Sequence, residues 1–257
     1  MRSAAFILLA VVGPALASAG LTEAQIGGIV LAPPAGARVP TELVLKNLEG
    51  RNTTLGEAIG GRPTLLLPAD FTCKQICGPA LTIAASALQQ TGLIAGSDYS
   101  LVVVGINPQD GVEEARRFAN SQVGGPGVAV LSGEGGTIEV LTTAIGYRFA
   151  ADLRNDAIAH PAALVVLAGD GRVSRTMSSL ALRPTDLRLA LVEAGNGSIG
   201  GLAGRIALLC YGFDAVHGIY TERVTSVLQI SGAITVLVLA AAIGMLLRRT
   251  RRPGAPA

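Results

Sequence analysis

Residues 63–79 read PTLLLPADFTCKQICGP, and this stretch decides the fold that the sequence predicts. Its first part, 63–68, is a short apolar run that is typical of a buried strand. A loop with Cys73 and Cys77 follows, and 80–90 is expected to form a helix. The two cysteines are therefore predicted at a strand-to-helix junction. We interpret such a pair, in a chain with only 3 cysteines, as a metal site, a redox pair or an accident of spacing.

Outward from this stretch, short apolar runs alternate with helical segments. The predicted strands are 99–106, 128–131 and 162–167, and the predicted helices are 112–122 and 184–193. Phe118 is expected to point inward from its helix, whereas Gly133-Glu134-Gly135-Gly136 is interpreted as a turn. Gly169-Asp170-Gly171 predicts a hairpin leading into 172–175. This alternation predicts an α/β domain with a mixed or parallel sheet covered by helices.

The cysteine spacing leaves two chemistries open. Thioredoxin-like folds hold active thiols at such a junction, where the helix N-terminus favours the thiolate. Their redox motif has two residues between the cysteines, whereas this chain has Lys74, Gln75 and Ile76. On a helix, positions i and i+4 share one face, so both sulfurs could bind one ion, and a distorted first turn would also allow a disulfide. Lys74 would favour the thiolate in either case.

A third ligand would favour the metal, and the chain has only 2 histidines, His160 and His217. His160 directly precedes the predicted strand 162–167, so its side chain could project from the sheet edge toward the cysteine loop. Two thiolates and one imidazole suit Cu(I) well and Cu(II) acceptably. Asp156 is a candidate to orient the imidazole ring. A buried structural histidine is the alternative interpretation.

These residues resemble the SCO/SenC family of copper chaperones, which help metallate cytochrome c oxidase. The resemblance covers roughly 43–194 and rests on Phe71-Thr72 before the Cys-x3-Cys pair, on Gly105-Ile106-Asn107-Pro108, and on a histidine that opens a strand ending in Gly169-Asp170-Gly171. It implies a thioredoxin-like domain in which Cys73, Cys77 and His160 bind copper. Lys74 and Gly78 stand where the family usually has proline, and Asn107 stands where it commonly has aspartate.

The resemblance leaves two functions open. In the first, the domain is a metallochaperone that receives copper from a periplasmic donor and delivers it to the binuclear copper site of the cytochrome c oxidase copper-binding subunit. In the second, Cys73 and Cys77 form a thiol-disulfide reductase or redox sensor acting on the cysteines of that subunit. The chaperone function requires His160, and the reductase or sensor function does not.

Both ends of the chain predict an exported, anchored protein. Residues 1–19 resemble a signal peptide, with Arg2 before an apolar run and small residues that fit cleavage after Ala17 or Ala19. Residues 227–247 carry no charge and are long enough to span a bilayer, and the basic tail 248–257 is expected to stay in the cytoplasm. We expect a thioredoxin-like domain at 20–194, a linker and juxtamembrane segment at 195–226, and a single C-terminal anchor. The main domain would lie in the periplasm, at the inner (cytoplasmic) membrane.

The charge of the domain excludes a nucleic-acid role. The whole chain has a formal net charge of +2 from 20 basic and 18 acidic residues. Setting aside Arg2 and the arginines at 248, 249, 251 and 252 leaves 15 basic residues and a net charge of −3. Such a domain has no electrostatic attraction for a phosphate backbone.

The third cysteine, Cys210, is separated by six residues from the second histidine, His217, in a stretch with Tyr211, Phe213 and Tyr220. The pair could bind a second metal or lend a ligand during transfer. We favour the alternative, a segment at the membrane interface in which the aromatic rings lie at headgroup level and Cys210 packs among apolar residues.

Overall fold

The computed structural model describes residues 21–73, 77–122, 127–152, 157–196, 211–214, 219–222 and 224–250. The signal peptide predicted at 1–19, together with Lys74, Asp156, Cys210 and His217, lies outside these ranges. The described helices are α1 (Glu23–Gly27), α2 (Leu55–Ile59), α3 (Cys77–Gln90), α4 (Val112–Gln122), α5 (Gly135–Ala144), α6 (Pro184–Ala194) and α8 (Val224–Thr250).

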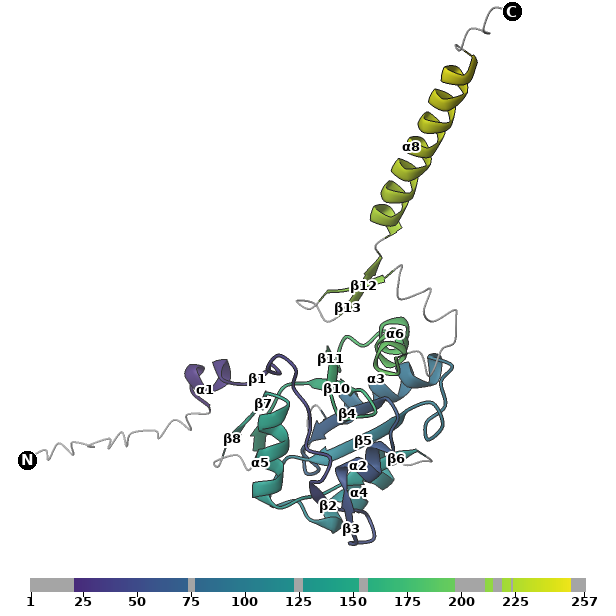
Figure 1. The fold of residues 1–257 in the computed structure, drawn as a ribbon. Helices are drawn as coiled ribbons and strands as arrows, with labels where there is room; N and C mark the ends of the chain where they lie inside the picture. The colour runs from purple at the N-terminus through teal and green to yellow at the C-terminus, as the bar shows by residue number, and fades with distance from the viewer. Residues whose placement is uncertain are drawn as a thin grey trace, which may run out of the picture.

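A five-stranded mixed sheet forms the centre of the domain, in the order β11-β10-β4-β5-β6 (Figure 1). Its strands are β4 (Thr64–Ala69), β5 (Ser100–Gly105), β6 (Val128–Leu131), β10 (Ala163–Leu167) and β11 (Val173–Ser178). Strands β4, β5 and β6 run parallel, whereas β10 is antiparallel to both β4 and β11. The strand that leads into the cysteine loop is therefore the central strand.

Four two-stranded antiparallel pairs surround this sheet. They are β1 (Val30–Leu31) with β7 (Tyr147–Arg148), β2 (Val44–Lys46) with β3 (Asn52–Thr54), β8 (Ala150–Asp152) with β9 (Ala157–Ala159), and β12 (Tyr211–Asp214) with β13 (Ile219–Glu222). The first pair joins the N-terminal segment to the chain that leads toward His160.

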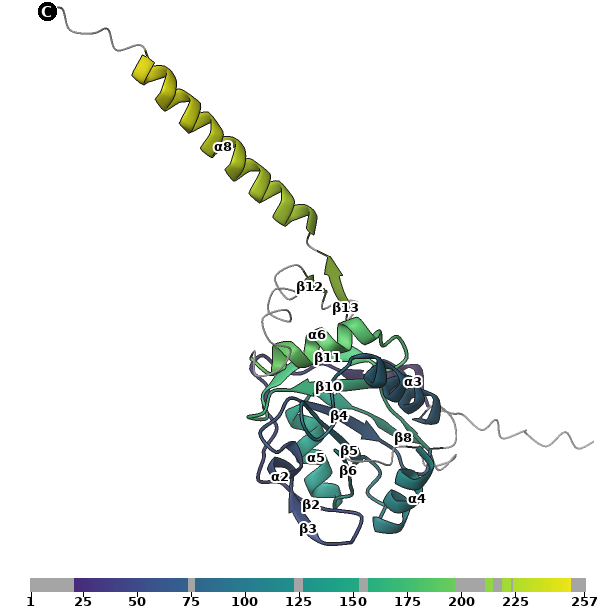
Figure 2. The ribbon, with the colours of Figure 1, turned by 90° about the vertical axis from the view of Figure 1, so that its right-hand side faces the viewer.

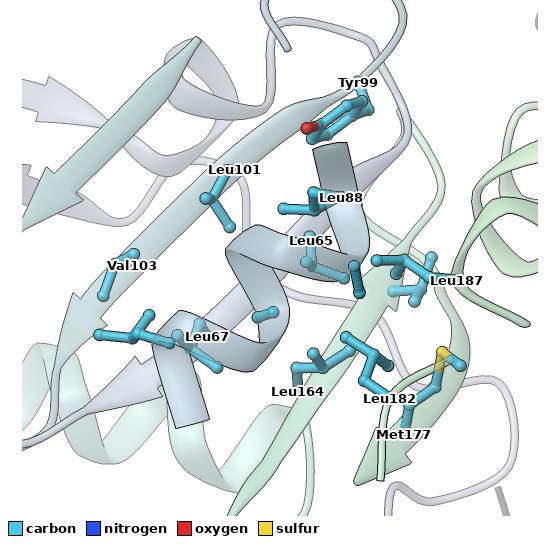
Figure 3. Close-up of a cluster of buried hydrophobic side chains, with 14 of the residues drawn as sticks. Leu65, Leu67, Leu88, Tyr99, Leu101, Val103, Leu164, Met177, Leu182 and Leu187 are labelled. Atoms are coloured by element: carbon cyan, nitrogen blue, oxygen red, sulfur yellow. The ribbon is translucent and has the colours of Figure 1, made fainter. Parts of the chain in front are cut away.

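Alternate residues of each central strand pack into two cores, one on each face of the sheet, because successive side chains of a strand point to opposite faces. Leu65, Leu67 and Leu164 contribute to the core that α3, α4 and α6 cover (Figure 3). Leu66 and Val165 contribute to the opposite core, which contains residues of α2 and α5. All six residues of β4 and of β5 are buried, as expected for parallel strands covered on both faces.

The sheet and its main helices confirm the predicted α/β fold. Strands 63–68, 99–106, 128–131 and 162–167 match β4, β5, β6 and β10 to within one residue at each end, and helix 112–122 matches α4. The predicted hairpin joins β10 to β11, and Phe118 is buried as expected. The helix predicted at 80–90 begins earlier, at Cys77, and α5 begins inside the glycine-rich stretch interpreted as a turn.

Figures 1 and 2 show α8 extending away from the sheet as a single long helix. Across the described residues, no helix is both long and apolar enough to cross a membrane, and the anchor at 227–247 stays a prediction. The hairpin of β12 and β13 lies within the segment expected to be linker and juxtamembrane region.

Candidate functional site

The cysteine loop begins where β4 ends, with a tight turn held by Asp70. The backbone N–H of Cys73 donates to the carbonyl oxygen of Asp70 at 3.2 Å. The Asp70 carboxylate accepts from the backbone N–H of Thr72 at 3.2 Å and from the Thr72 hydroxyl at 2.9 Å. Cys73 is partly buried, and Cys77 is the first residue of α3. The structure therefore places the two cysteines on either side of the strand-to-helix junction, as predicted.

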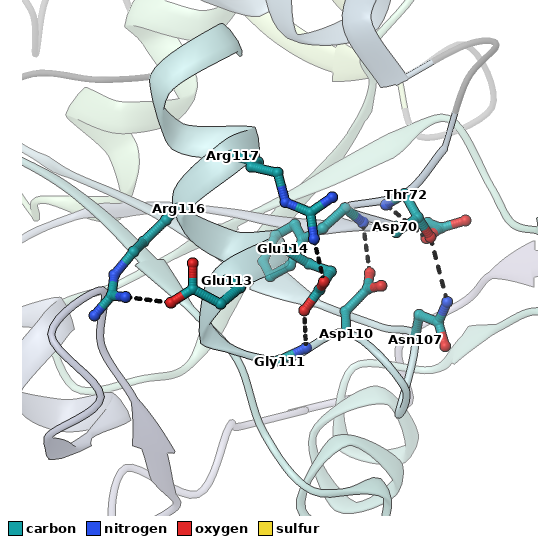
Figure 4. A network of polar contacts seen from close by, with 10 residues as sticks. Asp70, Thr72, Asn107, Asp110, Gly111, Glu113, Glu114, Arg116 and Arg117 are labelled. Atoms are coloured by element: carbon teal, nitrogen blue, oxygen red, sulfur yellow. Dashed lines mark hydrogen bonds and ion pairs between the residues drawn. The ribbon is translucent and has the colours of Figure 1, made fainter.

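Asp110 ties this loop to the next strand connection (Figure 4). Its Oδ2 accepts from the backbone N–H of Phe71 at 2.8 Å, which joins the end of β4 to the loop between β5 and α4. Asp70 and Asp110 are only 3% and 4% exposed. Burial, together with the nearby charge of Asp70, raises the pKa of Asp110 to about 6. Hydrogen bonds to two buried carboxyl groups, those of Asp70 and Asp110, thus hold the start of the cysteine loop.

Apolar contacts of the Phe71 ring also hold the cysteine loop in place. Its ring packs against Phe118 of α4 with a centroid distance of 4.9 Å. The ring also lies so close to Gly105 that a Cβ atom there would be 2.7 Å from Phe71 Cε2. The glycine at the end of β5 is therefore needed because the ring occupies the space of a side chain.

The sheet register brings His160 to the same end of β4. Val165 of β10 pairs with Leu66 and Leu167 with Thr64, so the chain before β10 runs back toward the last residues of β4. His160 lines a small, mostly apolar hollow together with Ala69 at the end of β4 and Ala80 in the first turns of α3. The imidazole therefore lies beside both elements that flank the cysteine loop.

Two oxygen atoms lie within hydrogen-bond distance of the Nδ1 atom of His160. The Tyr147 hydroxyl oxygen lies 2.9 Å from Nδ1, and the carbonyl oxygen of Pro161 lies 3.2 Å from it. Burial lowers the pKa of His160, while the hydrogen bond to Pro161 and the charge of Asp70 act in the opposite direction. A neutral imidazole is the form that binds metal ions.

A complete ligand set is not visible among the described side chains. Within the described ranges, no group of three or more His, Cys, Asp or Glu residues could hold a metal ion. The side chain of Cys77 is outside the described set, as are Asp156, Cys210 and His217. Three residues that support the site were not predicted as such from the sequence: Asp70, Asp110 and Tyr147.

The fold and the cysteine junction define the class as a thioredoxin-like protein. Solved structures with a similar fold include Sco proteins and a candidate electron transfer protein of Aquifex aeolicus VF5, which is 22% identical with a TM-score of 0.58. That match covers 64% of this chain and 96% of the other. Neither the family models nor the curated proteins contain a match to this chain.

Two of the Sco matches are covered almost completely by this chain. ScoI of Arabidopsis thaliana, solved with copper bound, is 16% identical with a TM-score of 0.52, covering 63% of this chain and 98% of ScoI. BsSco, a cytochrome c oxidase assembly protein in which a disulfide switch was identified, is 17% identical with a TM-score of 0.53, covering 65% and 98%. At these identities the likeness shows that the chain has the Sco fold.

Proposed function

We propose that this protein is a Sco-type copper chaperone that binds one copper ion through Cys73, Cys77 and His160. The observation that carries the proposal is the position of His160, which lies at the end of β4 and beside the first turns of the helix that Cys77 opens. The sheet register brings His160 to the same end of β4 as the loop that contains Cys73, and this proximity supports a shared site. Copper bound in Sco structures of the same fold supports the choice of metal.

The donor set agrees with copper chemistry. Thiolates are soft ligands that favour Cu(I), and imidazole binds copper in both common oxidation states. Cys77 lies at the N-terminus of a 14-residue helix, where the helix dipole stabilises the thiolate that a metal requires. Burial lowers the pKa of His160, which favours the neutral form that can act as a ligand.

Copper stoichiometry of the full chain in detergent tests this proposal. The reduced protein is loaded with Cu(I) without oxygen, dialysed against a competing chelator and assayed for copper and protein. We expect one copper per chain, no retention in Cys73→Ala or Cys77→Ala, and weaker retention in His160→Ala. Cys210→Ala and His217→Ala are the matched controls, and both should retain copper fully. Equal retention by wild type and both loop cysteine variants would refute the site.

The cytochrome c oxidase copper-binding subunit is the recipient that we propose, and a periplasmic copper donor would load the chaperone. Support comes from the fold shared with BsSco, a member of a family of cytochrome c oxidase assembly proteins. Mixing the copper-loaded chain with the metal-free subunit should move copper to the subunit. A mixture of the metal-free chain, the metal-free subunit and chelated copper gives the baseline amount of copper that the subunit takes up without a loaded chaperone.

We also propose that the chain is anchored in the inner membrane by its C-terminal segment, with the main domain in the periplasm. The uncharged stretch 227–247, followed by four arginines, supports this arrangement. So do the apolar side chains that α8 exposes: Ile230 is 63% exposed, Leu237 69% and Met245 71%. A helix that exposes large apolar side chains on several faces suits a lipid environment.

Thiol-disulfide exchange is the second candidate, favoured by the position of Cys77 at the start of α3. In this reaction Cys73 and Cys77 would pass two electrons to a disulfide of the oxidase subunit and become a disulfide themselves. The two candidates differ in their need for His160. If His160→Ala loses copper transfer but reduces the disulfide of the subunit at the wild-type rate, the reductase activity is the function to pursue.

A further inference from the structure

We infer that Tyr147 is a positioning residue that fixes His160 as its Nδ1–H tautomer and so makes Nε2 the ring nitrogen with a lone pair. The hydroxyl of Tyr147 donates its one proton to the Pro161 carbonyl oxygen at 2.8 Å. Its oxygen then faces His160 Nδ1, 2.9 Å away, as an acceptor. Among the described residues, both oxygen atoms near Nδ1 then act as acceptors, because the Pro161 carbonyl cannot donate.

The opposite tautomer conflicts with this arrangement. With the proton on Nε2, the lone pair of Nδ1 would face the carbonyl oxygen of Pro161 at 3.2 Å without a proton between them. The Tyr147 proton could satisfy Nδ1 only by leaving Pro161, since one hydroxyl has one proton. A proton on Nδ1 satisfies all three groups, and the hydrogen bond made by one ring nitrogen sets the role of the other.

The fold holds Tyr147 firmly enough for this role. The side chain is 2% exposed and belongs to the core on the α5 face of the sheet. Its backbone lies in β7, which pairs with β1 in the register Leu31 to Tyr147. The preceding Gly146 has φ +63°, and a Cβ atom there would lie 2.0 Å from the carbonyl oxygen of Ala32. The N-terminal segment thus packs tightly against the residue that orients the histidine.

The consequence for metal binding rests on the proposed function, whereas the tautomer does not. If copper binds at this site, Nε2 is the nitrogen that His160 presents to it. Hydrogen bonds that orient a ligating histidine are typically worth about 10- to 100-fold in metal affinity. Tyr147 would therefore contribute to the affinity without touching the metal.

The test uses metal-free full chain in detergent, labelled with nitrogen-15 in histidine only. The chain has only 2 histidines, so His217→Gln assigns both sets of signals. At about pH 8.5, some two units above the usual histidine pKa of about 6.5, two-bond nitrogen–proton spectra distinguish the tautomers. We expect His160 as Nδ1–H in the wild type and a substantial Nε2–H population in Tyr147→Phe.

Tyr99→Phe is the matched control, because Tyr99 is also buried but belongs to the core on the other face of the sheet. Tyr99→Phe should leave the two-bond nitrogen–proton signals of His160 unchanged. A wild-type His160 in the Nε2–H form, or identical spectra for wild type and Tyr147→Phe, would overturn the inference. Tyr147→Phe keeps the ring, and a wild-type thermal midpoint of unfolding would verify that the variant is folded.

Copper measurements on the same proteins separate this inference from the proposed function. We expect Tyr147→Phe to bind one Cu(I) per chain with about 10-fold lower affinity. If the tautomer responds to Tyr147 but wild-type protein binds no copper, the proposed function fails and the positioning role stands. If wild type binds copper and the tautomer does not respond, the positioning role fails alone.

Discussion

At the scale of single residues, Asp110 has the clearest measurable consequence. Its pKa in the folded chain is raised to about 6, above the usual aspartate value of 3.8. The folded state therefore binds the proton more tightly than the unfolded state, and the free energy of unfolding falls as pH rises between about 4 and 6. Above that window the ionised, buried carboxylate leaves the fold less stable than it is near pH 4.

Asp110→Asn should remove this pH dependence. The amide oxygen can accept from the Phe71 N–H, and the amide N–H can donate to Asp70, so the contacts of the protonated acid are retained. We expect the variant to gain about 1–3 kcal/mol over wild type at about pH 7.5 and little at about pH 4. Urea unfolding of both proteins at the two pH values, followed by near-UV circular dichroism, measures the difference.

Asp170→Asn provides a control of opposite sign. The Arg172 backbone N–H and the Arg38 guanidinium lower the pKa of Asp170, so its contribution is present at neutral pH and lost as pH falls through the folded-state pKa. Asp170→Asn should therefore lower the free energy of unfolding slightly at neutral pH and by a smaller amount in acid. A stability gain for Asp110→Asn that is equal at both pH values would contradict the account of Asp110.

At the scale of elements, the pairing of β1 with β7 depends on Gly146. An alanine there must adopt φ +63° and would place its Cβ atom 2.0 Å from Ala32 O. We expect Gly146→Ala to lower the free energy of unfolding by about 1–3 kcal/mol, through strain and loss of the pairing. Hydrogen exchange at the Ala32 amide should become faster in this variant, because its hydrogen bond to the carbonyl oxygen of Gly146, 2.9 Å long in the wild type, would be lost.

Gly136→Ala is the matched control for this substitution. Gly136 lies in the first turn of α5, and no atom lies within 4 Å of a Cβ built there. An alanine in a helix is favoured over glycine by roughly 0.5–1 kcal/mol, so this variant should be slightly stabilised. If both glycine variants lost the same stability, the close approach of β1 to Gly146 would not be the cause.

The elements that the sequence predicted well are those with a local signal. Strands β4, β5 and β6 are mostly apolar runs, and α4 is amphipathic, so each is recognisable from its own residues. Helix α5 was not expected because it begins with two glycines, which disfavour helices. Strands β1 and β7 have two residues each, and only the tertiary pairing of distant segments defines them.

The positions of the candidate ligands in the fold were predictable in the same measure, and the copper site itself stays a prediction. Cys73 and Cys77 lie in a recognisable junction, and His160 directly precedes a clear strand, so the sequence pointed to all three residues. The supporting contacts were not predictable, because they join residues far apart in the chain. Asp110 binds the backbone of Phe71 across 39 positions, and Tyr147 contacts His160 across 13. Only the sheet register brings such pairs together.

At the scale of the whole molecule, the proposed C-terminal anchor at 227–247 can be tested by truncation. We predict that a chain ending at residue 223 leaves the membrane fraction and appears in the soluble periplasmic fraction. The physical reason is the loss of about 20 apolar residues, the length needed to span a bilayer. Cell fractionation with antibody detection measures the distribution.

Replacing Arg248, Arg249, Arg251 and Arg252 with glutamine controls for charge. This variant keeps the apolar segment and should remain in the membrane fraction, with a smaller share in the predicted orientation. A truncated chain that still sediments with membranes would place the anchor elsewhere in the sequence.

The most direct test of the central claim is copper K-edge X-ray absorption on the Cu(I)-loaded full chain and on its His160→Ala variant. The account predicts two sulfur ligands and one imidazole nitrogen in the wild type, with the nitrogen shell lost and both sulfurs kept in the variant. A wild-type spectrum without a two-sulfur shell, or one that His160→Ala leaves unchanged, would contradict the proposed site of Cys73, Cys77 and His160.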